Sequence, residues 1–270
     1  MTELIYDLGA HNGDDTAFYL GQGYRVLAVE PHPLLAENLR QRFAQEIRAG
    51  RLTVLQAAIA DADQKKMTFY ISRADWKSSL IKEISAREAE ITGTVELITR
   101  TPGSLFAEFG LPYYCKMDIE GYDARVIAGM ARDPSRPPYL SCEVCCHEIG
   151  EIQADEQLLY CTLDGLVSAG YSAFKLVDQD HFAVLAGNNH YGVLHRLPAR
   201  VLEKIRRIFR PFLARAPRQT TSFFAEQLPG KWEDQAATKK YLSYHFRDYF
   251  RHTRNKRQIF WVDIHAKYSR

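Results

Sequence analysis

Three acidic residues of this sequence, Glu30, Asp118 and Glu143, each close a run of β-branched, aromatic or other apolar residues typical of a strand. Parallel strands present their carboxyl ends at one edge of a sheet, so we expect the three carboxylates to converge on one ligand site. Lys116 alternates with Asp118, which places both side chains on one face of their strand. His147 follows in the next loop. Asp118, Glu143 and His147 are therefore equal candidates for a base that takes a proton from a reacting hydroxyl.

Simpler interpretations of the same residues stay open. Lys116 could lower the pKa of a neighbouring group or bind an anionic acceptor, or it could form a salt bridge with Glu120. His147 could be a solvated loop histidine. We predict no metal site, while a divalent cation chelated by Asp118 and Glu143 remains the alternative.

The cysteines do not indicate a metal or a disulfide framework. Their number is odd, and no second Cys or His pair with zinc-ligand spacing accompanies Cys142-x-x-Cys145-Cys146-His147. Cys142 also lies inside an apparently buried strand. For Cys142-x-x-Cys145-Cys146-His147 we therefore favour core packing over the alternative, a zinc site.

A glycine turn precedes these strands in the chain. Residues 4–8 predict a strand that runs into Gly9, a tight turn leads to Gly13, and a helical pattern begins at Asp14. A second strand, 24–29, ends at Glu30-Pro31, because proline cannot continue a ladder of hydrogen bonds. Glycine lets the backbone turn sharply and approach a ligand, and a carboxylate ending the second strand can accept both ribose hydroxyls. The unit predicts a site for an adenosine-containing ligand.

The glycine spacing decides which adenosine ligand is favoured. A dinucleotide site requires G-x-G-x-x-G, but counting from Gly9 puts His11 and Asp14 at the second and third glycine positions. The helix opens with Asp14 and Asp15, which would repel a diphosphate and not a ligand with an ammonium and a sulfonium group. The spacing D-x-G-x-x-x-G therefore favours S-adenosylmethionine.

The elements that position these residues alternate between strand and helix. Strands are predicted at 52–56, 66–71, 95–99, 113–118, 139–143, 172–177 and 258–265, and helices at 34–47, 104–109, 123–130, 158–169 and 232–250. Small residues at 57–61, including Ala58, fit either a pocket for a flat ring or helix–sheet packing. Residues 72–94, with Trp76-Lys77-Ser78-Ser79-Leu80, are predicted as loop and weakly packed helix. We expect an α/β fold and one domain over residues 1–270, with a helical and basic insertion at about 178–257.

Composition and charge limit the classes of protein. The chain has 270 residues and a formal charge of +2. Its content of 46% hydrophobic residues is typical of an ordinary globular protein. The start of the sequence lacks the basic and apolar regions of an export signal, so a cytoplasmic location is expected. A basic block at 196–218 carries leucine, isoleucine and phenylalanine at helical spacing, which predicts a docked helix. Nucleic acid, an anionic substrate and a membrane surface are its lesser interpretations.

Three segments resemble the FkbM-type S-adenosylmethionine-dependent methyltransferases: DLGAHNGDDT at 7–16, AVEPHP at 28–33 and KMDIEGYDARVIAGM at 116–130. The third is similar to the K-I-D-V-E-G signature of that family, whereas the first is shared by class I methyltransferases generally. TTSFFAEQLPGKW and FWVDIHA, near the C-terminus, also look similar to one bacterial branch. His11 departs from the family, which usually has asparagine there.

The resemblance implies a class I, Rossmann-like methyltransferase fold, with a seven-stranded sheet of order 3-2-1-4-5-7-6 whose last strand is antiparallel. It also implies O-methylation of a hydroxyl on a small metabolite, a sugar or a lipid-linked glycan, without nucleic acid or a membrane span. A homodimer is left open. The alternatives are a protein that binds the cofactor without turnover and a nucleic-acid methyltransferase. On this basis the catalytic candidates are Lys116, Asp118, Glu143 and His147, and the expected cofactor contacts are Asp7, Gly9, Ala10, Asn12, Gly13, Thr16, Glu30, Ala58 and Asp118.

Overall fold

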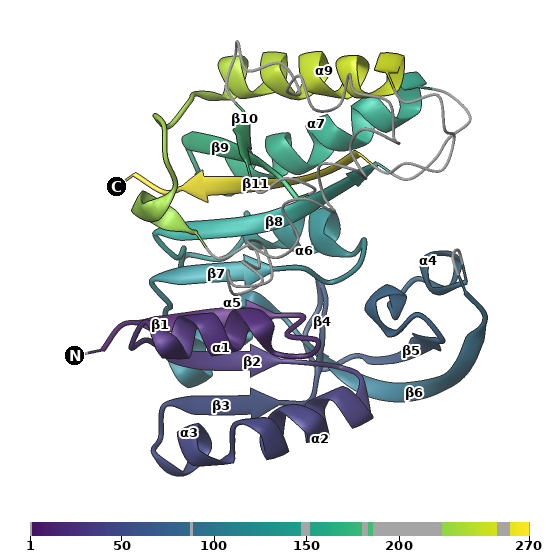
Figure 1. Cartoon of the computed structure of the whole chain (residues 1–270), viewed down its shortest axis with the longest axis vertical. Coiled ribbons are helices and arrows are strands. Elements are labelled where there is room, and N and C mark those ends of the chain that lie inside the picture. Colours follow the sequence, from purple (N-terminus) through teal and green to yellow (C-terminus); the bar gives the residue numbers. More distant parts are fainter. Residues whose placement is uncertain are drawn as a thin grey trace, which may run out of the picture.

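The computed structural model describes residues 2–86, 89–146, 152–179, 183–185, 223–252 and 260–269. His147 and the basic block 196–218 lie outside these ranges. An eight-stranded sheet runs through the molecule in the order β10-β9-β11-β8-β7-β1-β2-β3 (Figure 1). Its strands are β1 (Leu4–Leu8), β2 (Arg25–Val29), β3 (Leu52–Leu55), β7 (Tyr114–Met117), β8 (Tyr139–Cys146), β9 (Ala173–Asp178), β10 (Ala183–Leu185) and β11 (Phe260–Lys267).

The sheet is mostly parallel, which confirms the predicted α/β class. β1, β2, β3, β7 and β8 pair in parallel, while β11 is antiparallel to both of its neighbours, β8 and β9. The expected count of seven strands is wrong by one, because β10 pairs with β9 at the edge. A strand of three residues is too short for the alternation that signals a strand in a sequence.

A smaller sheet of order β4-β6-β5 stands beside the carboxyl ends of the parallel strands (Figure 1). It consists of β4 (Ala58–Ile59), β5 (Lys66–Ser72) and β6 (Ile91–Arg100), with the short helices η1 (Asp75–Lys77) and α4 (Lys82–Ser85). β6 begins four residues before the predicted strand and alternates between half-buried and exposed positions over most of its length. Residues 72–94, predicted as loop and weakly packed helix, therefore include η1, α4 and the first part of β6.

Helices cover both faces of the main sheet. They are α1 (Asp14–Gly21), α2 (Pro33–Arg42), α3 (Ala44–Arg48), α5 (Pro102–Phe109), α6 (Asp123–Met130), α7 (Ile152–Ser168) and α9 (Gln235–His252), with a turn of 3₁₀ helix, η2 (Ala225–Gln227). The buried hydrophobic residues form two core clusters. One cluster includes residues of α5, α6, α7 and α9, and the other includes residues of α1 and α2 together with Phe224. The single helix predicted at 34–47 is two helices, because the backbone at Phe43 departs from helical geometry.

The described cysteine side chains divide by position. Cys142 is free and fully buried, as predicted for a core residue. Cys115 is also free and fully buried, whereas Cys161 is exposed on α7. None of the described helices has the length and apolar character needed to cross a membrane.

Candidate functional site

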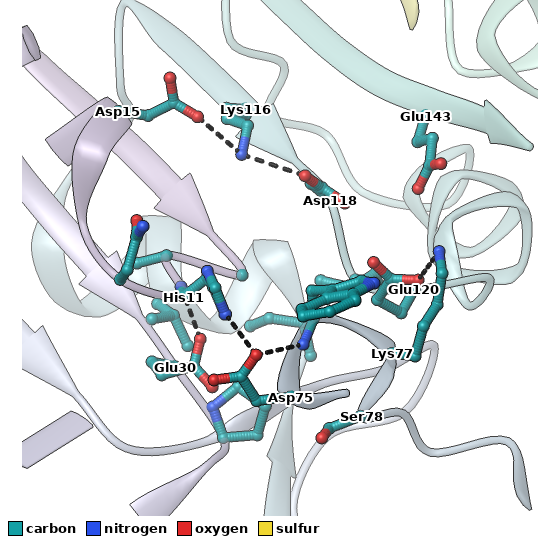
Figure 2. Close-up of a pocket in the computed structure, with 18 of the residues that line it drawn as sticks. His11, Asp15, Glu30, Asp75, Lys77, Ser78, Lys116, Asp118, Glu120 and Glu143 are labelled. Carbon is teal, nitrogen blue, oxygen red and sulfur yellow. Dashed lines mark hydrogen bonds and ion pairs between the residues drawn. The ribbon is translucent and has the colours of Figure 1, made fainter. Parts of the chain in front are cut away.

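A cavity of about 450 Å³ lies at the carboxyl ends of β1, β2, β7 and β8. The glycine turn and Glu30 line one part of it, and Asp118, Glu120 and Glu143 line another (Figure 2). The smaller sheet contributes Ala58 and the η1 segment. Glu30, Asp118 and Glu143 all line this cavity, as predicted. The prediction that Glu143 ends its strand is wrong, because β8 continues to Cys146 and Glu143 lies within it.

The glycine turn closes tightly against the neighbouring strand ends. Gly9 has a φ of 84° and its N–H donates to the carbonyl of Val29 at 2.9 Å. A β-carbon on Gly9 would overlap with the backbone carbonyl of Asp118. Gly13 also has a positive φ, and a β-carbon there would lie 2.7 Å from the ring of Phe43. Only glycine fits these two backbone positions without strain.

Asp7 and Thr16 are buried beneath this turn and do not line the cavity. The Thr16 hydroxyl donates to Asp7 Oδ2 at 2.6 Å, and both residues are fully buried. The other carboxylate oxygen, Oδ1, has no hydrogen-bond partner. Burial raises the pKa of Asp7 to about 6, although Lys116 pulls it down. This placement suits a support for the turn better than the direct cofactor contact that the sequence suggested.

Lys116 lies among three carboxylates, of which Figure 2 shows those of Asp15 and Asp118. Its Nζ is 3.0 Å from Asp15, 3.2 Å from Asp118 and 3.9 Å from Asp7. Burial alone would lower the pKa of Lys116, but the three carboxylates outweigh burial and the pKa lies well above its ordinary value. The lysine is therefore a cation at neutral pH. The alternative salt bridge to Glu120 is absent from the ion pairs of the described residues, where Glu120 pairs with Lys77.

Glu30 is held by the backbone on both sides. Its two carboxylate oxygens accept the N–H of His11 at 2.7 Å and the N–H of His32 at 2.8 Å. The side chain is 5% exposed and lines the cavity. Burial raises its pKa to about 7 despite the two hydrogen bonds. Each oxygen keeps a second lone pair, so the carboxylate can still accept hydroxyls from a ligand.

The remaining predicted cofactor residues lie at the cavity surface. Ala10, Asn12 and Ala58 line it, and Ala58 lies with Ala57 and Ile59 in an apolar strip. Asn12 uses its side chain locally, because Nδ2 donates to Asp14 and Oδ1 accepts the Asp14 N–H.

Acidic side chains crowd another part of the cavity. Asp118, Glu120 and Glu143 bring one carboxylate oxygen each to within 4.8 Å of one another. Glu120 has a φ of 52°, unusual for a residue with a β-carbon, and its carboxylate lies 3.0 Å from Lys77 Nζ. Burial and then the Asp118 charge raise the pKa of Glu143 well above its ordinary range, and the same two causes raise that of Asp263.

Sequence reasoning missed two groups of cavity residues. The η1 segment supplies Asp75, Trp76 and Lys77, and His11 Nε2 lies 3.3 Å from Asp75 Oδ1. The signal was a tryptophan and a lysine in a segment predicted to be loop. The second group consists of Gln179, directly after β9, and of Trp261 and Asp263 on β11. An aspartate within the apolar run of the closing strand was its only signal.

Known proteins that are similar to this chain are methyltransferases. The sequence profile of the Methyltransferase FkbM domain matches residues 7–172. Among solved structures, the chain is similar to methyltransferase FkbM from Methylobacillus flagellatus KT, with 19% identity and a TM-score of 0.40 over 65% of this chain and 40% of that chain. A SAM-dependent methyltransferase from Geobacter sulfurreducens, crystallised with S-adenosyl-L-homocysteine, shows 12% identity and a TM-score of 0.41 over 99% of this chain and 85% of that chain.

A shorter match links the chain to a curated relative. The Haloarcula marismortui protein named "Probable ribosomal RNA small subunit methyltransferase A" is 33% identical over 75 residues, which are 28% of this chain and 26% of that protein. The chain thus matches about a quarter of the length of this relative.

The family profile covers more than half of the chain and includes the glycine turn, Glu30 and the strand end at Asp118. It confirms the resemblance drawn from the sequence, and membership of a methyltransferase family supports S-adenosylmethionine as the cofactor. The chain belongs to the FkbM family of methyltransferases.

Proposed function

We propose that the protein transfers the methyl group of S-adenosylmethionine to a hydroxyl oxygen of a small acceptor, such as a metabolite, a sugar or a lipid-linked glycan. The observation that carries the proposal is that one cavity is lined both by the glycine turn with Glu30 and by the acids Asp118, after β7, and Glu143, on β8. One part is suited to a nucleoside and another to a hydroxyl that must lose a proton.

The cofactor part of this cavity fits the chemistry of an adenosine sulfonium compound. Glu30 is fixed by two backbone N–H groups where a ribose would present its hydroxyls. Ala57, Ala58 and Ile59 provide an apolar strip for a flat ring. When bound, S-adenosylmethionine supplies an activated methyl group and a positive charge. Asp15 and Asp118 balance positive charge here, as they already do for Lys116.

The acceptor part supplies positioning and a proton acceptor. Methyl transfer is an in-line displacement, so holding the acceptor oxygen in line with the methyl group accounts for much of the rate. Glu143 is a suitable base, because burial and nearby acids raise its pKa and so make its carboxylate more basic than an ordinary glutamate. Trp76 and Trp261 line the same cavity and are partly exposed, so they offer flat apolar surfaces to a sugar or a similar acceptor.

We further propose that residues 1–270 act as one methyltransferase domain. The pairing of β11 with β8 and β9 supports this, since the segment after β9 returns to the main sheet. We also propose His147, which lies outside the described residues, as a base or acceptor contact, and a homodimer as the assembly.

Two measurements test the proposed activity. Calorimetric titration should show binding of S-adenosylmethionine and none of NAD. Incubation with cofactor labelled in the methyl group and a panel of hydroxylated acceptors should move the label to an acceptor oxygen, located by mass spectrometry. Binding without transfer to any acceptor class would leave a cofactor-binding protein, and the absence of binding would refute the proposal.

A nucleic-acid acceptor is the second candidate, favoured by the short match to the Haloarcula marismortui protein and by the basic block 196–218. We propose weak polynucleotide binding instead, because the formal charge of the chain is only +2. Fluorescence titrations with duplex and single strands at two salt concentrations test this. A nucleic-acid enzyme should bind duplex DNA with submicromolar affinity, and its log affinity should fall with log salt concentration with a slope of about 0.9 per phosphate contact. Loss of this binding in the double variant Arg206→Glu with Arg207→Glu would favour that enzyme.

A further inference from the structure

The carboxylates of Asp118, Glu120 and Glu143 come from two segments of chain that meet at one point of the cavity. Asp118 and Glu120 lie in the loop after β7, and Glu143 lies on β8, the next strand of the sheet. One oxygen of each lies within 4.8 Å of the others (Figure 2). Opposed oxygen ligands of one Mg²⁺ are about 4.2 Å apart, given metal–oxygen distances of about 2.1 Å. Three oxygens cannot all oppose one another, so side-chain rotation must bring at least two pairs of them to the separation of adjacent ligands, about 3.0 Å, for the three to share one ion.

The charge balance of the cavity favours a cation. Its described lining contains eight aspartate and glutamate side chains against two lysines, Lys77 and Lys116. Two lysines of the described chain contact the cluster: Lys116, which is shared among Asp118, Asp15 and Asp7, and Lys77, at 3.0 Å from Glu120. Neither ammonium forms an ion pair with Glu143, so negative charge exceeds positive charge in the described part of the cavity.

Two buried side chains at this cavity lack partners in the described part of the chain. Glu143 is only 8% exposed and forms no hydrogen bond or ion pair there, and it points toward Glu120 and Lys77 (Figure 2). Gln179, outside the cluster, is 3% exposed and lines the same cavity, yet neither its Oε1 nor its Nε2 has a hydrogen-bond partner. Buried polar groups are normally satisfied, so these two indicate a ligand that supplies positive charge and polar contacts.

We propose that Asp118, Glu120 and Glu143 bind one divalent cation of the oxygen-preferring kind, Mg²⁺ or Mn²⁺. Three carboxylates without histidine or cysteine are the donor set that suits these ions. Water or an acceptor oxygen completes the coordination, and Lys77 moves away from Glu120 when the ion enters. Binding of the ion requires no methyl transfer, so this proposal can be tested by itself.

The consequence for catalysis rests on the proposed function. A cation at this point can coordinate the acceptor hydroxyl and lower its pKa, so that the proton leaves to a carboxylate or to water. The oxygen then forms its bond to the methyl carbon as the carbon–sulfur bond breaks, and sulfur keeps the electron pair as a neutral thioether. The site thereby favours acceptors with an oxygen that a hard cation can bind.

The decisive experiment titrates the full-length protein with Mn²⁺ without cofactor and follows free Mn²⁺ by electron paramagnetic resonance. One site per chain is expected, with Mg²⁺ competing for it. Glu143→Gln and, separately, Glu120→Gln should each lower the affinity at least about tenfold. Glu37→Gln, on the exposed surface of α2, is the matched control and should leave the affinity unchanged.

Lys77→Met distinguishes a cation site from a structural salt bridge. If the lysine competes with the ion for Glu120, its removal should raise the Mn²⁺ affinity. Circular dichroism shows which variants are folded, and calorimetry with S-adenosylmethionine tests the proposed function separately. Equal Mn²⁺ binding by the parent protein and both glutamine variants would overturn the proposal. A folded parent protein that binds no Mn²⁺ would also overturn the proposal. If an amine-bearing acceptor then stabilised that protein against thermal unfolding, the negative charge of the cluster would be assigned to substrate recognition.

Discussion

The backbone of Gly9 lies directly against the backbone carbonyl of Asp118, so that a β-carbon on Gly9 would overlap with that oxygen. The turn after β1 and the loop after β7 therefore touch without an intervening side chain. This contact fixes the distance between the part of the cavity that contains Glu30 and the part that contains Asp118, Glu120 and Glu143.

Gly9→Ala should damage both stability and cofactor binding. The added methyl group must displace the Asp118 carbonyl, and the φ of 84° is unfavourable for alanine, so the free energy of unfolding should fall by at least about 2 kcal/mol. Urea denaturation measures the change. Gly21→Ala is the control, because no atom lies within 4 Å of its added β-carbon, and it should change stability by less than about 1 kcal/mol.

Glu30→Gln should change stability in a manner that depends on pH. Burial raises the pKa of Glu30 from its ordinary 4.5 to about 7, so the stability that Glu30 contributes is full below pH 4.5 and is lost as pH rises through 7. The loss approaches about 3 kcal/mol above pH 7. Glutamine does not titrate but leaves one backbone N–H unsatisfied, at a cost of about 1–3 kcal/mol. The variant should therefore be less stable than the parent near pH 4.5 and comparable or more stable at pH 8.5.

Urea denaturation at the two pH values checks this prediction for Glu30, and a stability difference that does not vary with pH would contradict it. Calorimetry of the same variant is expected to show at least tenfold weaker binding of S-adenosylmethionine, since lost hydrogen bonds to a charged group typically cost about 1.5–3 kcal/mol.

Lys116→Met should destabilise the protein, and more so at high pH. The substitution leaves Asp7 and Asp15 beside Asp118 without their shared cation, and breaking a buried ion pair typically costs about 3–5 kcal/mol. Acid protonates the stranded carboxylates, so the loss should be smaller at pH 5 than at pH 8. Thermal unfolding at both values measures the effect, and Lys82→Met, on the exposed side of α4, serves as control. Equal losses from the two substitutions would disprove the role of Lys116.

Asp118→Asn should lower methyl transfer by roughly 10²-fold if the carboxylate orients the cofactor or the acceptor. The shape of the side chain is nearly preserved, while the charge opposite Lys116 is lost. Single-turnover rates with labelled cofactor give the measurement, and Asp164→Asn, at a half-buried position of α7 that does not line the cavity, is the matched control. Full activity of the Asp118 variant would remove this residue from the mechanism.

The parts of the site that follow from local backbone chemistry were predictable from the sequence. Gly9 and Glu30 could be placed because a strand, a glycine turn and a strand closed by proline leave few alternatives. Asp7 was predicted to contact the cofactor, whereas its side chain is fully buried and does not line the cavity. The spacing of a motif does not show which of its side chains are buried. Lys77 and Asp263 were missed, because their positions depend on the smaller sheet and on β11, which approach the cavity from distant parts of the chain.

The position of β11 has a consequence for how the chain folds. β11 comes after every other described strand in the sequence, yet it lies between β8 and β9 and bonds to both. Until it inserts, each of those strands presents an unpaired edge, and such edges invite pairing with other chains. Contacts between distant segments also form slowly, because closing a long loop costs entropy before any contact repays it. We therefore expect β11 to dock late in folding, and a chain that ends before residue 260 to aggregate.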